Sequence, residues 1–312
     1  MKLLVFDGNS IINRAFYAIK GNLTAADGTP TNAVYGFLKL YFKYFEMSKP
    51  DMVAVAFDMR APTFRHKMYD EYKAGRHKMP DELGAQFEPL KDILRAMNVC
   101  IFEKEGYEAD DIIGTLSKYC TDNGYECDIV SGDRDDFQLV NDKVRVIMPV
   151  TKGGMSEIDI IDTAAIREKY ALEPSALIQL KAVMGDSSDN IKGVPGIGEK
   201  GALALIQQFG SLDGIYKNLD DPSIKAGTRK KLEEGRESAY LSLELATICL
   251  EAPIEITDEK MLLKPYDTGT LTSLLDRYSL QSFLRSLDLE KGLDRVEAAP
   301  AVPAEAKDYV YI

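Results

Sequence analysis

The chain has 312 residues, of which 45% are hydrophobic, with a formal net charge of −12, two histidines and four cysteines. A chain of this length can bury about 75% of the surface that its unfolded form exposes, so we expect a folded enzyme with more than one domain. No apolar run approaches the roughly 18 residues of a membrane span, and the first run ends at Asp7, too soon for a signal-peptide core, so a cytoplasmic protein is expected. The cysteines show no CxxC spacing and there are only two histidines, so the sequence has few candidate residues for a zinc site or a Ser-His triad.

Short β-rich runs alternate with helical periodicity up to about residue 150. Strands are predicted over 2–6, 52–57, 99–102, 128–131 and 144–148, and helices near 10–20, 33–47, 81–97 and 109–122. Such alternation predicts βαβ units, and therefore an α/β fold with a mainly parallel twisted sheet and helices on both faces. We assign residues 1–162 to this domain.

The second half of the chain is predicted to be nearly all helical. From about residue 163, short helices are joined by turns that contain Gly and Pro, and we assign 163–290 to a helical subdomain packed on the sheet. Residues 291–312 are predicted to form a linker, because 296–307 are rich in Ala, Pro and Glu and poor in large apolar side chains. The DYVYI after it is similar to the opening of another strand. The sequence leaves open whether the chain is the front part of a longer polypeptide or ends in a natural tail.

Acidic residues gather in five short clusters, three of which directly follow predicted strands. The nine acids are Asp7, Asp58, Glu108, Asp110, Asp111, Asp133, Asp135, Asp186 and Asp189. Ligands of open α/β sheets bind beyond the carboxyl ends of the parallel strands, so these acids are expected to converge there. Like charges at close range repel, and the collection makes sense chiefly if divalent cations such as Mg²⁺ neutralise it. Each cluster taken alone is equally explained by helix caps and turns, whereas the joint occurrence favours a two-metal phosphodiesterase.

A basic segment follows the strand that precedes Asp58. Six Lys or Arg residues lie between Arg60 and Lys78, against only two acids, which matters because the net negative charge at first argues against a nucleic-acid partner. Lys73 and Arg76 are the nearest candidates to stabilise charge on a pentavalent phosphorus, with Arg14 and Arg65 behind them. The alternative is a solvated helix face. Weak helical signal between Gly75 and Pro80 predicts a mobile loop or helix that orders on substrate.

The segment GVPGIGEKGA, residues 193–202, predicts a phosphate clamp. Its glycines let the backbone approach a polyanion, and the helix expected from about Glu199 would point its N-terminal amides at phosphate. This is half of a helix-hairpin-helix motif, which would grip duplex without reading its sequence. A simple connection between helices is the alternative. Nearby basic residues supply phosphate partners: Lys192, Lys200, Lys225, Arg229, Lys230 and Lys231.

Seven motifs, in order, resemble those of a known family. They are FDGNSIINRAFYA, TNAVYGF, VAFD, FRHKMYDEYKAGR, EGYEADD, SGDRDDFQL and GDSSDNIKGVPGIGEKGA. Over about residues 1–290 the chain closely resembles the 5′-nuclease family found at the front of bacterial DNA polymerase I, which is related to the flap endonucleases and has a PIN-like fold.

The resemblance implies roles for particular residues. The nine acids fall on the family's metal-site positions, with two or more Mg²⁺ ions as cofactors and Mn²⁺ as a substitute. Tyr72, Lys73 and Arg76 fall on the base of a helical arch over about 62–82, and Arg14 on a basic active-site position. The hairpin, at 190–209, falls on the family's DNA-binding motif, where K⁺ can lie on backbone carbonyls. The DNA-binding set comprises Arg65, Lys192, Gly193, Val194, Gly196, Ile197, Gly198 and Lys200.

The resemblance also implies an activity. It predicts removal of 5′ flaps and RNA primers in DNA replication and repair, leaving 5′-phosphate and 3′-hydroxyl ends, by a monomer acting in the nucleoid on branched or nicked duplex DNA. A polymerase domain is expected as partner, in cis or in trans. A non-catalytic module that binds DNA junctions is the competing hypothesis. An aspartyl-phosphate phosphatase is disfavoured because Asn9 stands where that mechanism places its second acid.

Overall fold

The computed structural model describes residues 1–19, 21, 23–152 and 155–287, so the predicted linker lies outside the described part. The strands are β1 (Lys2–Asp7), β2 (Met52–Ala56), β3 (Cys100–Phe102), β4 (Glu126–Val130), β5 (Val144–Lys152) and β6 (Met155–Ile161). The helices of the first half are α1 (Gly8–Ala18), α2 (Asn32–Ser48), α3 (Phe64–Met68), α4 (Asp81–Gly84), α5 (Phe87–Ala96), α6 (Ala109–Asp122) and the 3₁₀ helix η1 (Asp135–Leu139). Those of the second half are α7 (Thr163–Tyr170), η2 (Pro174–Ala176), α8 (Leu177–Met184), α9 (Glu199–Phe209), α10 (Leu212–Lys217), α11 (Ala226–Glu234), α12 (Arg236–Ala246), α13 (Asp258–Met261), α14 (Thr268–Arg277) and α15 (Gln281–Leu287).

Six strands form one sheet in the order β3-β2-β1-β4-β5-β6. The first five run parallel, and β6 pairs antiparallel with β5. The mainly parallel α/β sheet is therefore confirmed, and β6 is an edge strand that the sequence analysis did not predict. From β1 the sheet first grows on one side, to β2 and β3, and then on the other, to β4 and β5. Because β1, β2 and β4 are parallel neighbours, their carboxyl ends lie side by side.

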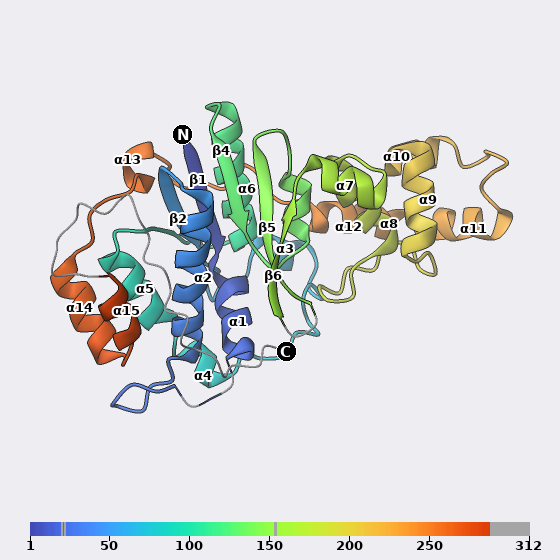
Figure 1. The fold of residues 1–312 in the computed structure, drawn as a ribbon. Coiled ribbons are helices and arrows are strands. Elements are labelled where there is room, and N and C mark those ends of the chain that lie inside the picture. The colour runs from blue at the N-terminus through green and yellow to red at the C-terminus, as the bar shows by residue number, and fades with distance from the viewer. Residues whose placement is uncertain (20, 22, 153–154, 288–312) are drawn as a thin grey trace.

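Helices cover both faces of the sheet (Figure 1). Successive side chains of a strand point to opposite faces, and apolar side chains on each face pack against helices. Leu4 and Phe6 point into one core, which contains residues of α1, α2 and α5. Leu3 and Val5 point into the other, which contains residues of α6 and η1. Both sets are fully buried, so β1 is held between two apolar layers and the site at its end rests on rigid structure.

The helices after β6 divide between two places. Buried side chains of α8, α9, α10, α11 and α12 form a separate core at one end of the elongated molecule (Figure 1). The chain then returns to the sheet: Leu263 donates its amide to the carbonyl of Asp51 beside β2, and Leu271 and Leu275 of α14 belong to the core with α5. Residues 258–287 thus pack against β2, α5 and α2, although the sequence pattern had placed them with the DNA-binding helices. The division of the chain into domains stays a prediction.

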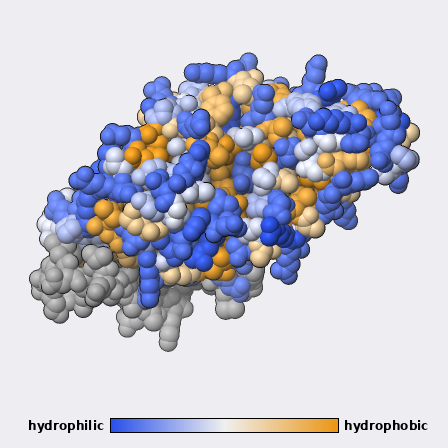
Figure 2. All heavy atoms as spheres, turned by 90° about the horizontal axis from the view of Figure 1, so that it is seen from above, coloured by the Kyte–Doolittle hydropathy of each residue, from blue (hydrophilic) through white to orange (hydrophobic). Residues whose placement is uncertain are grey.

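The basic segment over 62–82 is helical only near its two ends. It forms α3 and the start of α4, with turns between them around Gly75, where the helical signal in the sequence is weak. Seen from above, hydrophilic residues cover most of the molecule and hydrophobic ones show between them in small patches (Figure 2). Among the described residues, no helix combines the length and the apolar character needed to cross a bilayer.

Candidate metal centre and nucleic-acid interface

The carboxyl edge of the sheet brings together acids that are far apart in the sequence. Asp7 ends β1 and caps α1, accepting a hydrogen bond of 2.9 Å from the amide of Ser10. Ser131, directly after β4, donates its hydroxyl to Asp7 at 3.2 Å and accepts the amide of Asp133 at 3.0 Å. These local bonds fix the loop after β4 against the end of β1, so the predicted convergence of Asp7 and Asp133 is present.

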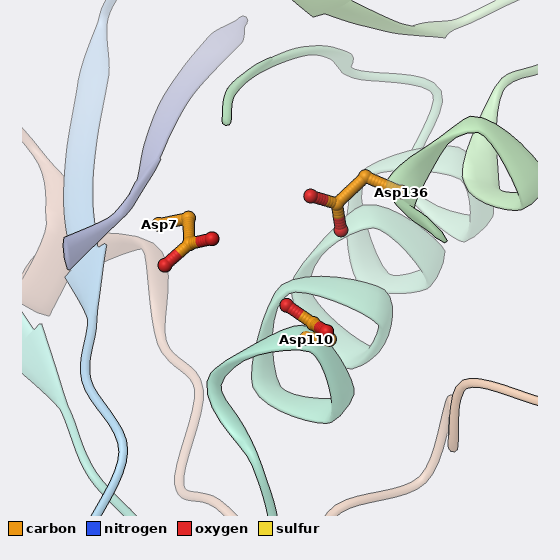
Figure 3. Close-up of side chains that lie close together, drawn as sticks. All are labelled: Asp7, Asp110 and Asp136. Carbon is orange, nitrogen blue, oxygen red and sulfur yellow. The ribbon is translucent and has the colours of Figure 1, made fainter. Parts of the chain in front are cut away.

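Three carboxylates meet at the centre of this edge. One oxygen from each of Asp7, Asp110 and Asp136 lies within 4.8 Å of the others, and the three groups point toward one another from β1, α6 and η1 (Figure 3). Burial, together with the neighbouring charges of Asp58 and Asp133, raises the pKa of Asp7 to about 7. Burial and the facing carboxylates likewise raise the pKa values of Asp110 and Asp136 well above the ordinary range. We call these three acids the central cluster.

Asp58 and Asp133 flank the central cluster. Asp58 accepts the amide of Ala109 at 2.7 Å, which ties the end of β2 to the start of α6. Burial is the main cause that raises the pKa of Asp58, and the charge of Glu108 adds to it. The charge of Asp133 raises the pKa of both Asp7 and Asp110. Such mutual destabilisation of the charged forms is what a bound cation would relieve.

A second group of acids is bridged by a lysine. The Lys181 ammonium from α8 pairs with Asp135 and lies 2.6 Å from Asp186. Burial opposes the charge of Asp186, but hydrogen bonds from Lys181 and Ser188 lower its pKa to about 2. Asp135 is more deeply buried and lies near Asp133, so its pKa is raised to about 6 despite Lys181. In this structure the lysine supplies the positive charge between the two carboxylates.

The basic segment closes on a third pair of acids. The Lys73 ammonium lies 2.7 Å from Glu108, and Arg76 lies 2.5 Å from Asp189. Tyr72 donates its hydroxyl toward both acids, at 3.0 Å from Glu108 and 3.3 Å from Asp189. The backbone amide of Lys73, in the left-handed region at φ 57°, donates to the carbonyl of Asp189. Tyr72, Lys73 and Arg76 therefore contact Glu108 and Asp189 and hold the base of the segment against these acids, while their catalytic role stays a prediction.

Asp111 and Arg65 pair with each other and lie apart from the central cluster. From the sequence, Asp111 was predicted to be a metal-site acid and Arg65 a DNA-binding residue. Two guanidinium nitrogens of Arg65 donate to the two carboxylate oxygens of Asp111 at 2.8 Å. Asp111 also accepts the amides of Glu108 and Cys249, so its oxygens are committed to the protein interior. Arg65 is only 2% exposed, which leaves this expected DNA-binding side chain out of reach of a phosphate. Of the acids in EADD, Asp110 alone joins the cluster.

Arg14 also points elsewhere. Its guanidinium donates to the Thr151 hydroxyl on β5 at 2.9 Å, and among the described residues it forms no ion pair with the nine acids. Its predicted role near the reacting phosphate stays a prediction.

A tight turn connects α8 to α9, where the phosphate clamp was predicted. Gly193 has φ 61°, and a Cβ there would lie 2.2 Å from the amide nitrogen of Gly185, so only glycine fits without movement. Gly198 caps α9, and a Cβ at that residue would meet no atom within 4 Å. Gly198 and the first turn of α9 are exposed. Lys231 donates to the carbonyl of Gly196 at 2.8 Å.

The rest of the expected DNA-binding set surrounds this turn. Lys200 is exposed in the first turn of α9, and Val194 and Ile197 are buried in the core below it. Lys192 is also exposed, and its ammonium lies 3.1 Å from Glu71 of the basic segment. This ion pair joins the turn to the segment that covers the acids.

Two residues of the site were missed from the sequence, Asp136 and Lys181. The run DRDD offered four adjacent polar residues, and a 3₁₀ helix turns successive side chains by about 120°, so Asp135 and Asp136 face different groups. Lys181 is the only charged residue of α8, LIQLKAVM, and that isolation on an apolar helix was the available signal.

The donors gathered here fit hard divalent cations. Every side chain of the central cluster and its flanks offers carboxylate oxygen, which Mg²⁺ and similar ions prefer, and none offers the sulfur or imidazole typical of a zinc site. A parallel α/β sheet that collects acids at its carboxyl edge, with basic side chains over them, is an arrangement typical of hydrolases that cleave phosphate esters with bound cations.

Comparison with known proteins identifies the family. Residues 2–171 match the N-terminal resolvase-like domain of 5′-3′ exonucleases, and residues 172–269 match the C-terminal SAM fold of the same enzymes. The chain belongs to the 5′-3′ exonuclease family.

Curated relatives and solved structures agree with this family. The chain is 43% identical over 93% of its length to DNA polymerase I of Caldicellulosiruptor bescii and 40% identical over 95% to that of Bacillus subtilis, and it spans about a third of the length of each, 34% and 33%. A T5 5′-exonuclease structure with bound zinc ions has a TM-score of 0.65 at 22% identity, covering 89% of this chain and all of that one. Human GEN1 in complex with Holliday junction DNA has a TM-score of 0.59 at 17% identity, covering 89% and 68%. These structures share the fold.

Proposed function

We propose that this chain is a Mg²⁺-dependent, structure-specific 5′ nuclease. Its substrates would be branched or nicked duplex DNA with 5′ flaps, and RNA primer ends, and its products would carry 5′-phosphate and 3′-hydroxyl groups. The observation that carries the proposal is the convergence of acids at the carboxyl edge of the sheet beneath Lys73 and Arg76. A non-catalytic junction-binding module would need no buried carboxylates of this kind.

The acids would hold two divalent cations. We assign Asp7, Asp58, Asp110 and Asp133 to one cation and Asp135 and Asp186 to the other, with Glu108 and Asp189 toward the basic segment. When bound, the cations would supply an ionised water at neutral pH and charge stabilisation for the leaving oxygen. Mn²⁺, which also accepts oxygen ligands, would substitute for Mg²⁺.

The basic segment would stabilise the reacting phosphate. Lys73 and Arg76 already lie over Glu108 and Asp189, so a phosphodiester bound at the cations would meet both side chains. Release of their ion pairs would leave two positive groups free for the extra charge on the pentavalent phosphorus. Tyr72 would keep the base of the segment in register, because its hydroxyl reaches the same two acids.

The turn between α8 and α9 would hold the duplex as a helix-hairpin-helix motif. The exposed first turn of α9, which carries Lys200, suits a phosphate of the DNA backbone. A K⁺ ion would bind carbonyls of this turn, where Lys231 now supplies an ammonium to Gly196. The chain would act as a monomer in the nucleoid-containing cytoplasm, with a polymerase domain in cis or in trans.

Cleavage of a 5′-flap duplex labelled at both ends tests the proposal. We expect cutting near the junction with Mg²⁺, no cutting with a chelator, and loss of cutting in Asp133→Ala and Asp186→Ala while DNA binding persists. Asp142→Ala, an exposed acid before β5, serves as the control and should cut normally. A wild-type chain that binds the substrate but leaves it intact with Mg²⁺ and with Mn²⁺ would support the junction-binding module instead.

A further inference from the structure

Asp136 is a buried acid without a partner. It is 0% exposed, and neither of its carboxylate oxygens has a hydrogen-bond partner in the structure. Asp128 is almost as buried, at 1% exposed, but it accepts hydrogen bonds from Arg145 and Ser48. A carboxylate removed from water is costly when no hydrogen-bond partner lies within reach, and the Ser131 hydroxyl nearby favours its charged form only in part, so the environment of Asp136 lacks a component.

A positively charged partner for Asp136 would lie on the side of Asp7 and Asp110. Because η1 has three residues per turn, Asp135 turns toward Lys181 and Asp136 turns inward, where its carboxylate points at the other two (Figure 3). All three groups place an oxygen within 4.8 Å of one another. Within the described part of the chain, no Lys or Arg forms an ion pair with any of these three acids.

The two groups of acids differ in how their charge is met. Asp135 and Asp186 already have the ammonium of Lys181 between them. The central cluster has hydrogen bonds to Asp7 from Ser10 and Ser131, and no side-chain cation among the described residues. A divalent cation therefore gains more at the central cluster, where it displaces nothing, than at the second group, where it must compete with a lysine.

We propose that Asp136 is a ligand of the divalent cation held by Asp7 and Asp110, and that this cation binds tightly before DNA does. The inference rests on the proposed metal-dependent function and adds to it a residue and an order of binding. The cation between Asp135 and Asp186 binds second and more weakly, because Lys181 occupies that place in the free protein.

Mn²⁺ binding to the full chain without DNA, followed by electron paramagnetic resonance, tests the assignment. We expect one tight and one weaker class of ion in the wild type. Asp136→Asn, which keeps the shape and removes the charge, should weaken the tight class by about tenfold or more, since even the outer partners of metal ligands change affinity by 10–100-fold. Asp128→Asn is the matched control: it removes the charge of an equally buried carboxylate outside the site and should leave both classes unchanged.

A second variant separates metal binding from folding. Asp136→Leu removes the unpartnered carboxylate and fills its place with an apolar group, so the metal-free chain should melt at the same or a higher temperature than the wild type. The rise in melting temperature that Mn²⁺ gives the wild type should shrink in this variant, because stabilisation by a ligand grows with the logarithm of its concentration over its Kd, and a weaker site gains less.

The outcomes distinguish this inference from the proposed function. Unchanged Mn²⁺ affinity in Asp136→Asn, with flaps still cut by the wild type, would overturn the role of Asp136 and leave the nuclease standing. A wild type that cuts no flap, but whose tight Mn²⁺ class depends on Asp136, would uphold the ligand and remove the nuclease. Equal weakening by Asp128→Asn would reduce Asp136 to a structural residue.

Discussion

At the scale of single residues, the site is organised by which charge compensates which acid. Lys181 meets Asp135 and Asp186, and Lys73 meets Glu108. Asp111 has Arg65 and is thereby removed from the site. Among the described residues, no basic side chain forms an ion pair with the central cluster or with Asp58 and Asp133, so a bound cation would stabilise the charged forms of these acids most.

Lys73→Ala is expected to slow the chemical step far more than it weakens DNA binding. Its ammonium is needed most when charge develops on the phosphate, and loss of one such donor typically slows a reaction by about 10²-fold or more. Single-turnover cleavage and equilibrium binding of the same flap substrate measure the two effects. Lys67→Ala, an exposed lysine of α3, is the control and should change binding slightly and the rate little. Equal losses in rate and binding would make Lys73 a simple tether.

The raised pKa of Asp7 predicts that metal stabilises the protein more at higher pH. Because its pKa is about 7 in the folded chain against 3.8 for the ordinary group, the folded state holds this proton more tightly than the unfolded state. Asp7 therefore lowers the free energy of unfolding of the metal-free protein as pH rises from about 4 to about 7, and a cation that replaces the proton removes this loss.

Melting temperatures with Mg²⁺ and with a chelator check this prediction. The rise in melting temperature given by Mg²⁺ should be larger at about pH 8 than at about pH 6. The corresponding gain in the free energy of unfolding is up to about 1.4 kcal/mol for each pH unit over which Asp7 would otherwise be protonated. Asp7→Asn should lose much of this dependence on pH. An equal rise at both pH values would contradict the link between this carboxyl and the cation.

Residue positions were predictable where backbone topology alone decides them. Asp7 and Asp133 follow neighbouring parallel strands, so their convergence follows from the fold. The choice between Asp135 and Asp136 depends on the 3₁₀ turn of η1, and the commitment of Asp111 depends on Arg65, 46 residues away. Such contacts depend on side-chain packing that a periodicity of apolar residues does not encode.

At the scale of elements, buried strands were easier to predict than edges and connections. β1 and β2 are apolar on both faces, as central parallel strands must be. β6 escaped notice because Glu157 and Asp159 interrupt its apolar residues, which suits an antiparallel edge strand and obscures its pattern. The packing of α14 on α5 could not be predicted either, because the pattern of an amphipathic helix does not indicate which core its apolar face joins.

The turn between α8 and α9 offers a test at this scale, because two of its glycines are needed for different reasons. Gly193→Ala should destabilise the protein by more than about 1 kcal/mol, since the added Cβ meets the backbone of Gly185 at 2.2 Å and the residue has φ 61°. Gly198→Ala has free space for its Cβ, so the fold should tolerate it. There the methyl group would instead keep a phosphate from the amides of α9 and weaken DNA binding.

Chemical denaturation and DNA binding of the two variants separate these effects. Gly193→Ala should unfold at lower denaturant concentration, and Gly198→Ala should unfold as the wild type does while binding duplex less tightly. If Gly198→Ala binds duplex with unchanged affinity, the amides of α9 are no phosphate site and the turn is only a connection between helices.

At the scale of the whole molecule, a net charge of −12 must be reconciled with a polyanionic substrate. The acids gather at the carboxyl edge of the sheet, where cations would neutralise them, and exposed lysines gather around the turn before α9. Binding therefore depends on a local positive surface and not on the sum of charges. The site and the turn are also joined directly, because Lys192 pairs with Glu71 of the segment that covers the acids.

The salt dependence of DNA binding tests this arrangement. Each phosphate neutralised by a lysine releases condensed counterions, so the logarithm of the affinity should fall linearly with the logarithm of salt concentration. Lys200→Ala should weaken binding to all duplex sequences alike and make the slope shallower by about one. Lys143→Ala is the matched control, because this exposed lysine precedes β5 at the opposite edge of the sheet and its loss should leave the slope unchanged. Equal changes in both variants would mean that DNA senses only the overall charge, and a slope near zero in the wild type would mean that phosphate contacts do not hold the substrate.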